Sequence, residues 1–162
     1  GGNVSPMLLE RLAREPYRAN MRRGSNLSSP IPAQTHIGPK VLLINNYSAS
    51  DGDLFPYGFR QLKLGPIIGV RTWGGIVGIS GSLPFVDGGD LRKPEFTSYG
   101  LDSGDWIIEG YGVDPDIRVD NDPYREYMGI DDQLNKAIEV ALEQLKNRKP
   151  LPPIPAAPDR SK

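Results

Sequence analysis

Apolar residues occur along this chain in two patterns, short continuous runs and helical repeats. The runs lie at 41–44 and within 67–72, and each is typical of a strand buried on both faces. Between them, residues 53–64 carry an apolar helical face, with Gly65 as the residue after the helix and Pro56 in its first turn. Residues 40–72 are therefore predicted to form a β-α-β unit with parallel strands.

The flanking segments carry weaker signals. A short helix is predicted from Ser5, with Ser5 as N-cap, Pro6 at the first helical position and Pro16 as the stop. Residues 17–39 are polar and are expected to be loop with at most one short strand. Residues 74–100 are rich in glycine and predict hairpins, and 106–109 and 116–119 are expected to be edge or terminal strands.

The last helix has the clearest periodicity. Apolar residues recur at i, i+3, i+4, i+7, i+8 and i+11, with acidic residues at the start and basic residues at the end. The Pro-rich segment 150–162 is expected to be a tail that builds no core. We therefore expect an α/β fold for residues 1–149, followed by the tail. The periodic residues are Leu134, Ala137, Ile138, Ala141, Leu142 and Leu145.

Composition excludes several classes of function. The chain has 19 Lys and Arg against 20 Asp and Glu, so nothing favours nucleic acid or an anionic membrane as partner. There is no cysteine and no apolar run of a membrane span's length. We expect no metal or cofactor, because no EF-hand loop or phosphate-binding glycine motif is present. The lack of cysteine favours a cytoplasmic location, with a periplasmic or secreted one left open.

Ser50 follows the first buried run and precedes a helix. Active sites of open α/β sheets gather at the carboxyl ends of strands, where a helix N-terminus offers unpaired N–H groups to an oxyanion. Ser50, with the N–H of Asp51 beside it, fits a nucleophile, although the spacing differs from the G-x-S-x-G turn of α/β-hydrolases. The alternative is that Ser48 and Ser50 are helix caps or turn formers.

Three segments carry a resemblance to a known family. Residues 40–57 (KVLLINNYSASDGDLFPY) resemble the nucleophile segment of the tricorn peptidases, a branch of the C-terminal processing peptidases. Residues 71–79 (RTWGGIVGI) and 109–117 (EGYGVDPDI) resemble the next two signatures, in the same order. Gly1-Gly2-Asn3 is similar to the end of the family's glycine-rich oxyanion turn. The resemblance covers roughly residues 1–145 and implies a crotonase/ClpP-like mixed sheet.

The resemblance implies a role for each matching residue. Ser50 would attack the scissile carbonyl, and the N–H groups of Asp51 and of Gly2 or Gly1 would hold the oxyanion. Glu109 matches the carboxylate that orients the base through an intervening side chain, although an acid here also suits a structural ion pair. Related peptidases use a Ser–Lys dyad, but residues 72–75 contain no lysine, which leaves a Ser and a His base.

That histidine is expected outside this chain. The only histidine, His36, precedes the first buried strand, so about 15 Å of strand separates it from Ser50. We therefore expect the chain to be the C-terminal half of a peptidase core, inactive without its upstream half. The resemblance further implies a peptide substrate and a homo-oligomer. Two alternatives stay open: a non-catalytic peptide- or ligand-binding module of the same fold, and an interaction fragment with an exposed sheet edge.

Overall fold

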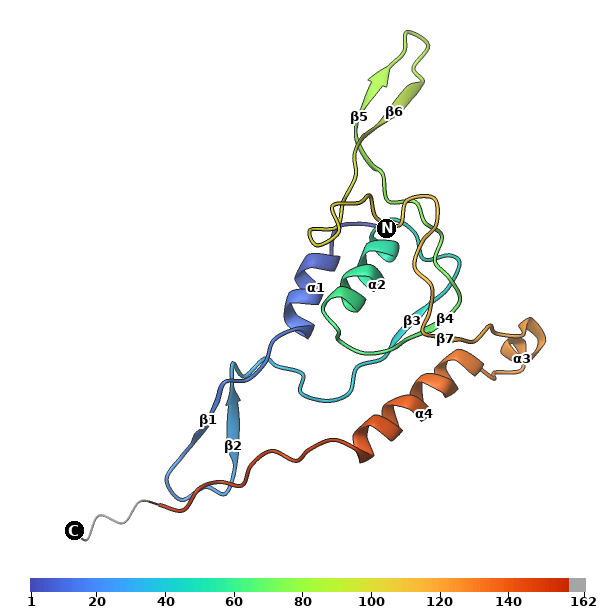
Figure 1. Cartoon of the computed structure of the whole chain (residues 1–162). Coiled ribbons are helices and arrows are strands. Elements are labelled where there is room, and N and C mark those ends of the chain that lie inside the picture. Colours follow the sequence, from blue (N-terminus) through green and yellow to red (C-terminus); the bar gives the residue numbers. More distant parts are fainter. Residues whose placement is uncertain (158–162) are drawn as a thin grey trace.

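The computed structural model describes residues 1–157, with helices and strands joined by long loops (Figure 1). The helices are α1 (Ser5–Leu12), α2 (Asp51–Gln61), α3 (Pro123–Tyr127) and α4 (Asp132–Lys146). The strands are β1 (Arg18–Met21), β2 (Ser28–Ile31), β3 (Leu42–Ile44), β4 (Ile67–Gly69), β5 (Gly78–Pro84), β6 (Asp90–Phe96) and β7 (Ile117–Arg118).

The central sheet has the order β3-β4-β7, and all three strands run parallel. Leu42 pairs with Ile67 and Ile44 with Gly69, so the β-α-β unit predicted for 40–72 is confirmed. The expected terminal strand near 116–119 is also confirmed, as β7. Among the strands of the described residues, antiparallel pairing occurs in two separate hairpins, β1–β2 and β5–β6, and not in the central sheet.

The core lies between α2 and the sheet. Phe59 of α2 packs with Ile44, Ile67 and Val113 in one buried cluster. Ile67 and Ile68 are both fully buried, and neighbouring strand residues point to opposite faces, so β4 is covered on both sides. On β3, by contrast, Leu43 is 37% exposed. The expectation that this strand is buried on both faces is therefore wrong at β3, an edge strand with one open side.

The ends of α2 differ from the expected ones. The helix begins at Asp51, two residues before the predicted start, which puts Pro56 inside the helix instead of in its first turn. The residue with positive φ after the helix is Lys63 (φ 53°), not Gly65. Gly65 is needed for another reason, since a Cβ there would collide with the Lys40 carbonyl. That contact is tertiary and cannot be read from the local pattern.

Two further expectations are corrected outside the central sheet. Residues 17–39, expected to be loop with at most one short strand, form the hairpin β1–β2. Residues 106–109, expected to be a strand, make only an isolated bridge from Trp106 to Tyr99 and then turn. The hairpin expected within 74–100 is present as β5–β6 and projects beyond the rest of the molecule (Figure 1).

Helix α4 confirms the predicted C-terminal helix and contacts β3 and β4. Of its apolar repeat, Ala137 is buried, but four large residues remain between 46% and 54% exposed. The helix therefore presents an uncovered apolar stripe, and burial within this chain uses only part of its apolar surface. The four residues are Leu134, Ile138, Leu142 and Leu145.

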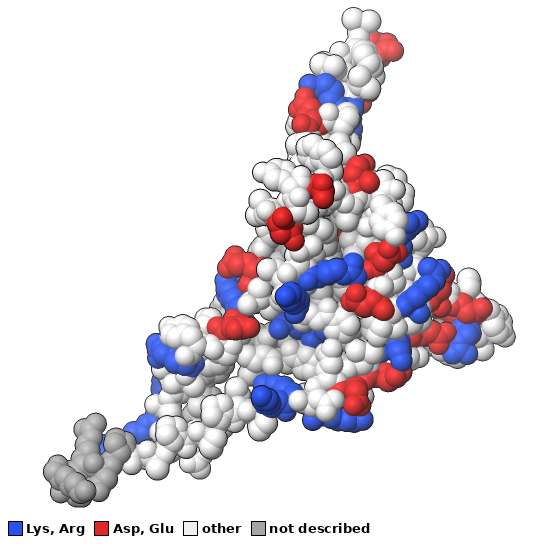
Figure 2. Space-filling view, in the orientation of Figure 1, with Lys and Arg blue, Asp and Glu red and all other residues white. Residues whose placement is uncertain are grey.

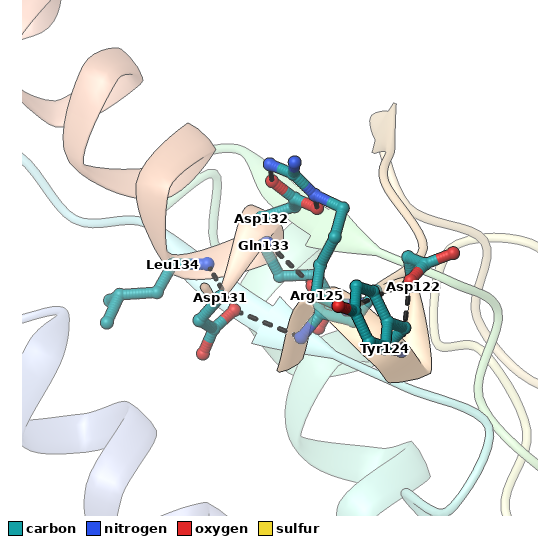
Figure 3. Close-up of polar contacts among 8 residues, drawn as sticks. Asp122, Tyr124, Arg125, Asp131, Asp132, Gln133 and Leu134 are labelled. Carbon is teal, nitrogen blue, oxygen red and sulfur yellow. Dashed lines mark hydrogen bonds and ion pairs between the residues drawn. The ribbon is translucent and has the colours of Figure 1, made fainter. Parts of the chain in front are cut away.

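The join between α3 and α4 is held by polar contacts (Figure 3). Asp131 caps α4 by accepting the Leu134 N–H at 2.9 Å, and this hydrogen bond lowers the pKa of its carboxyl. Arg125 of α3 donates twice to Asp132 at 2.8 Å, which lowers the pKa of that carboxyl. Helix α3, absent from the sequence prediction, thus docks on the start of α4 by a bidentate ion pair.

Charges of both signs are interspersed on the face shown in Figure 2. Within the described part of the chain, no helix is both long and apolar enough to span a membrane. Residues 150–157 form neither helix nor strand, and the remainder of the predicted tail, 158–162, lies outside the described residues.

Replacing Asp132 with Asn should lower the melting temperature at neutral pH. Because folding lowers the pKa of Asp132, the ionised carboxyl stabilises the fold above the unfolded-state pKa, and this contribution is lost as the pH falls through the folded-state pKa. The gap between wild type and Asp132→Asn should therefore close on acidification, as followed by circular dichroism. Glu143→Gln, which removes an exposed i,i+3 pair with Lys146, is the control and should shift melting less. A gap of constant size at all pH values would contradict this.

Candidate active site

Ser50 lies where the chain passes from β3 into α2, immediately before Asp51. The turn before it is closed by Ser48, whose N–H donates to the Asn45 carbonyl at 3.0 Å and whose Oγ accepts the Asn45 N–H at 3.3 Å. Ser48 is therefore a turn former. Ser50 occupies the N-cap position but is exposed and has φ 60° and ψ −115°. Such a conformation costs about 1–3 kcal/mol and persists only where the surroundings enforce it.

The two glycines at the start of the chain lie next to this turn. A Cβ built on Gly1 would stand 3.6 Å from Ser50 Cβ and 3.9 Å from Ser50 Oγ, so Gly1 lies within van der Waals range of the Ser50 side chain. Gly2 has φ 124°, in the region that favours glycine. The structure thus brings together Ser50, Asp51 and the Gly1–Gly2 turn, three parts of the site expected from the sequence.

The side chain of Asp51 binds the residues that follow the two glycines, at the start of α1. Its Oδ2 accepts the N–H groups of Val4 at 2.9 Å and Ser5 at 3.1 Å, and its carbonyl accepts the Ser5 hydroxyl at 3.1 Å. The expectation that Ser5 caps the first helix is therefore wrong. Ser5 is the buried first residue of α1, and its hydroxyl bonds to α2, because Asp51 satisfies the free N–H groups at the helix start.

Asp53 is completely buried and accepts three backbone hydrogen bonds. Its Oδ2 takes the Ser50 N–H at 2.8 Å and the Gly75 N–H at 3.2 Å, and its Oδ1 takes the Gly74 N–H at 2.8 Å. The sequence interpretation assigned no role to Asp53. The signal that points to it is the S-x-x-D spacing from Ser50 to Asp53, the pattern of a capping box.

Glu109 binds the same segment two residues further along. Its Oε2 accepts the N–H groups of Ile76 at 2.6 Å and Val77 at 3.0 Å. Two carboxylates therefore take the four successive amides of residues 74–77, Asp53 from the Ser50 side and Glu109 from the other. Glu109 itself is exposed. The alternative role, a structural ion pair with an Arg, is not seen among residues 1–157, where Glu109 binds backbone amides instead.

The second and third signature segments are also joined through their backbones. Thr72 donates its N–H to the Val113 carbonyl at 3.1 Å and accepts the Val113 N–H on Oγ1 at 2.8 Å. The Gly110 N–H donates to the Gly74 carbonyl at 2.7 Å. Residues 72–77 and 109–113, about 40 residues apart in the sequence, are thus hydrogen-bonded into one unit beside the Ser50 turn. We call this unit the wall.

His36 lies elsewhere, as predicted. Its Nε2 is 3.2 Å from the Pro39 carbonyl, and the ring lines a cleft of about 360 Å³ with Leu12 and Lys63, at the C-terminal ends of α1 and α2. Ser50 lies at the N-terminal end of α2, so neither His36 nor Lys63 is at the site. Among residues 1–157, no group of three or more His, Cys, Asp or Glu side chains is placed to hold a metal ion.

An apolar cleft of about 280 Å³ opens beside the Ser50 turn. It is lined by residues of α1, β3 and α2 and by Gly1 and Ser48. Leu8, Leu43 and Phe55 are among the apolar side chains in its wall.

Comparison with known proteins decides the family. The sequence profile of Peptidase family S41 matches residues 5–119. The chain belongs to this family. Within S41 serine peptidases it is similar to the tricorn protease of Thermoplasma volcanium, at 42% identity over 151 residues, and to that of Thermoplasma acidophilum, at 40% over 148. A putative tricorn-like protease C-terminal subunit of Sulfurisphaera tokodaii is 42% identical over 148 residues. The resemblance inferred from the motifs is thus confirmed.

The tertiary structure agrees with the S41 assignment. The crystal structure of the tricorn protease superposes with a TM-score of 0.82 at 38% identity, over 91% of this chain and 14% of that one. A putative peptidase from Parabacteroides merdae shares the fold alone, with a TM-score of 0.57 at 22% identity over 72% of this chain and 36% of that one. The chain covers 14% of each Thermoplasma protein and 17% of the Sulfurisphaera one, while those matches span 91–92% of this chain.

Replacing Gly74 with Ala should destabilise this S41 chain more than the same change at Gly88. Both glycines have positive φ, 90° and 84°, which costs an alanine about 1–2 kcal/mol. At Gly74 the new Cβ would also lie 2.5 Å from the Gly112 nitrogen, whereas nothing lies within 4 Å at Gly88. Overpacking should add about 1–3 kcal/mol at Gly74 only. Urea unfolding measures both losses, and equal losses would contradict the tight packing of the wall.

Proposed function

We propose that the protein containing this chain is a serine peptidase that hydrolyses peptides through an acyl-enzyme on Ser50. The observation that supports this most directly is the exposed, strained Ser50 at the start of α2, with Gly1 against its side chain. Strain of this kind concentrates at functional sites, and a serine that served only as a helix cap would gain nothing from it.

In this mechanism the Ser50 Oγ attacks the scissile carbonyl while a base takes its proton. The carbonyl oxygen becomes an oxyanion, which accepts hydrogen bonds from the Asp51 N–H and from the Gly1–Gly2 turn. Each such donor contributes about 10²–10³ in rate. The base then protonates the leaving amine, and water releases the acyl group from Ser50 by the reverse sequence of proton transfers.

The base in this proposal is a histidine supplied by a segment outside this chain, because His36 lies at the other end of α2. Glu109 would orient that base through an intervening side chain. One oxygen of Glu109, Oε2, takes both backbone amides, and within residues 1–157 the other oxygen accepts no hydrogen bond. This geometry supports a relay, since the fixed carboxylate keeps an acceptor for a further donor.

Residues 1–149 would form the C-terminal half of a crotonase/ClpP-like catalytic domain, completed by an upstream half. The open edge of β3 and the exposed apolar stripe on α4 support this, because unpaired strand edges and apolar stripes are normally covered in a finished protein. A homo-oligomer is proposed from the same exposed surfaces and from the family resemblance, and a cytoplasmic location from the lack of cysteine.

Replacing Ser50 with Ala in the full-length protein should lower kcat for peptide hydrolysis by about 10⁴–10⁶-fold, since no other group can form the acyl-enzyme. Ser48→Ala is the matched control two residues away. It removes a hydroxyl used only in the turn and should change kcat by less than about tenfold. Hydrolysis that survives Ser50→Ala would overturn the peptidase proposal in favour of a peptide-binding module.

The isolated chain, residues 1–162, should not be labelled at Ser50 by a fluorophosphonate probe, because a serine hydroxyl without its base is a poor nucleophile. Adding the upstream segment that supplies the base should restore labelling at Ser50. Mass spectrometry of the labelled peptide reports the site. Labelling of the isolated chain at the rate of the full-length protein would contradict a base from outside.

A further inference from the structure

We propose that Asp53 is the positioning residue of the Ser50 site, an inference that rests on the proposed peptidase function. Its carboxylate is fully buried and accepts three hydrogen bonds, all from backbone N–H groups. One of these is the N–H of Ser50 itself. Burying a carboxylate is costly unless it is hydrogen-bonded, so Asp53 needs the three amides in place. The amides in turn are held in position by Asp53.

The first task of Asp53 is to hold the strained backbone of Ser50. The Ser50 N–H is bound by Asp53 Oδ2 at 2.8 Å, and the Ser50 carbonyl accepts the N–H groups of Asp53 at 2.8 Å and Leu54 at 3.0 Å. Both peptide groups of Ser50 are thus tied to the first turn of α2. This locks the residue in φ 60° and ψ −115°, the conformation that projects its hydroxyl beside Gly1.

The second task is to set the distance between Ser50 and Glu109. Asp53 binds the amides of Gly74 and Gly75, and Glu109 binds those of Ile76 and Val77. The segment 74–77 therefore connects the nucleophile turn to the carboxylate proposed to orient the base. Catalysis by proton transfer depends on such distances, and a displacement of about 1 Å can cost about 10²-fold in rate.

An asparagine at position 53 cannot reproduce this arrangement. Asn has one acceptor oxygen and one NH₂ group, whereas both carboxylate oxygens of Asp53 face N–H donors. In either orientation, the NH₂ group would meet the Gly74 N–H or those of Ser50 and Gly75. The turn must then shift, although the side-chain volume is almost unchanged.

The test uses the full-length protein with Asp53→Asn and, as matched control, Asp116→Asn. Asp116 also holds a backbone amide, that of Ile67 at 2.8 Å, and pairs with Arg60. It immediately precedes β7, at the entry end of the parallel strands, whereas Ser50 lies beyond the exit end of β3. Asp53→Asn should lower kcat about 10–100-fold and leave KM within about twofold. Asp116→Asn should leave both within about twofold, whatever it does to the melting temperature.

A second variant leaves the Asp53 side chain intact and covers the case in which Asp53→Asn does not fold. Glycolic acid in place of Gly74 exchanges one N–H for an ester oxygen and removes only the bond to Asp53 Oδ1. It should lower kcat about three- to tenfold at constant KM. An unchanged kcat in this ester, or a kcat in Asp53→Asn equal to that in Asp116→Asn, overturns the positioning role. Ser50→Ala tests the function separately: if that variant stays active, the peptidase proposal itself fails.

Discussion

Two carboxylates on four consecutive amides determine the geometry of this S41 site. Asp53 and Glu109 come from segments more than 50 residues apart, and both end on the backbone of residues 74–77. Backbone N–H groups buried away from water must be bound, and a carboxylate binds them more strongly than a carbonyl does. The signature segments therefore converge because each contributes what another lacks: acids from two of them and free amides from the third.

The central unit was predictable because buried strands and helices require recognisable patterns of apolar residues. Short apolar runs at 41–44 and within 67–72 indicated strands, although burial on both faces holds only for β4, and the periodic face between them indicated a helix. The hairpin β1–β2 has no such apolar pattern, since none of its residues is buried. The strand expected at 106–109 failed for the opposite reason. Its apolar residues resemble a strand, but Gly110 and Gly112 turn the chain to meet Thr72 and Gly74.

At the site, the location of Ser50 could be predicted from the sequence, but the hydrogen bonds that hold it could not. Ser50 follows from a local rule, a polar residue at the exit of a buried strand before a helix. Its partner Asp53 also has a local signal, the capping spacing to Ser50, but its other two bonds reach Gly74 and Gly75, 21 and 22 residues away. Nothing in the spacing of those residues says that a carboxylate will receive their amides. Asp51 is a similar case, because its side chain binds the start of α1 while its N–H serves the proposed oxyanion site.

The division of the proposed site between this chain and another segment has a physical basis. Oxyanion donors contribute to rate only if they are oriented before charge develops, so they belong on one rigid body with the nucleophile. Here the Asp51 carboxylate binds the start of α1, which follows Gly1 and Gly2, and the Asp53 carboxylate binds the Ser50 N–H, both from the first turn of α2. A general base needs only reach and a suitable pKa, and it can arrive from elsewhere if something orients it. Glu109 would orient the base from the wall. A base from another segment would therefore meet a nucleophile, oxyanion donors and an orienting acid that are already in position.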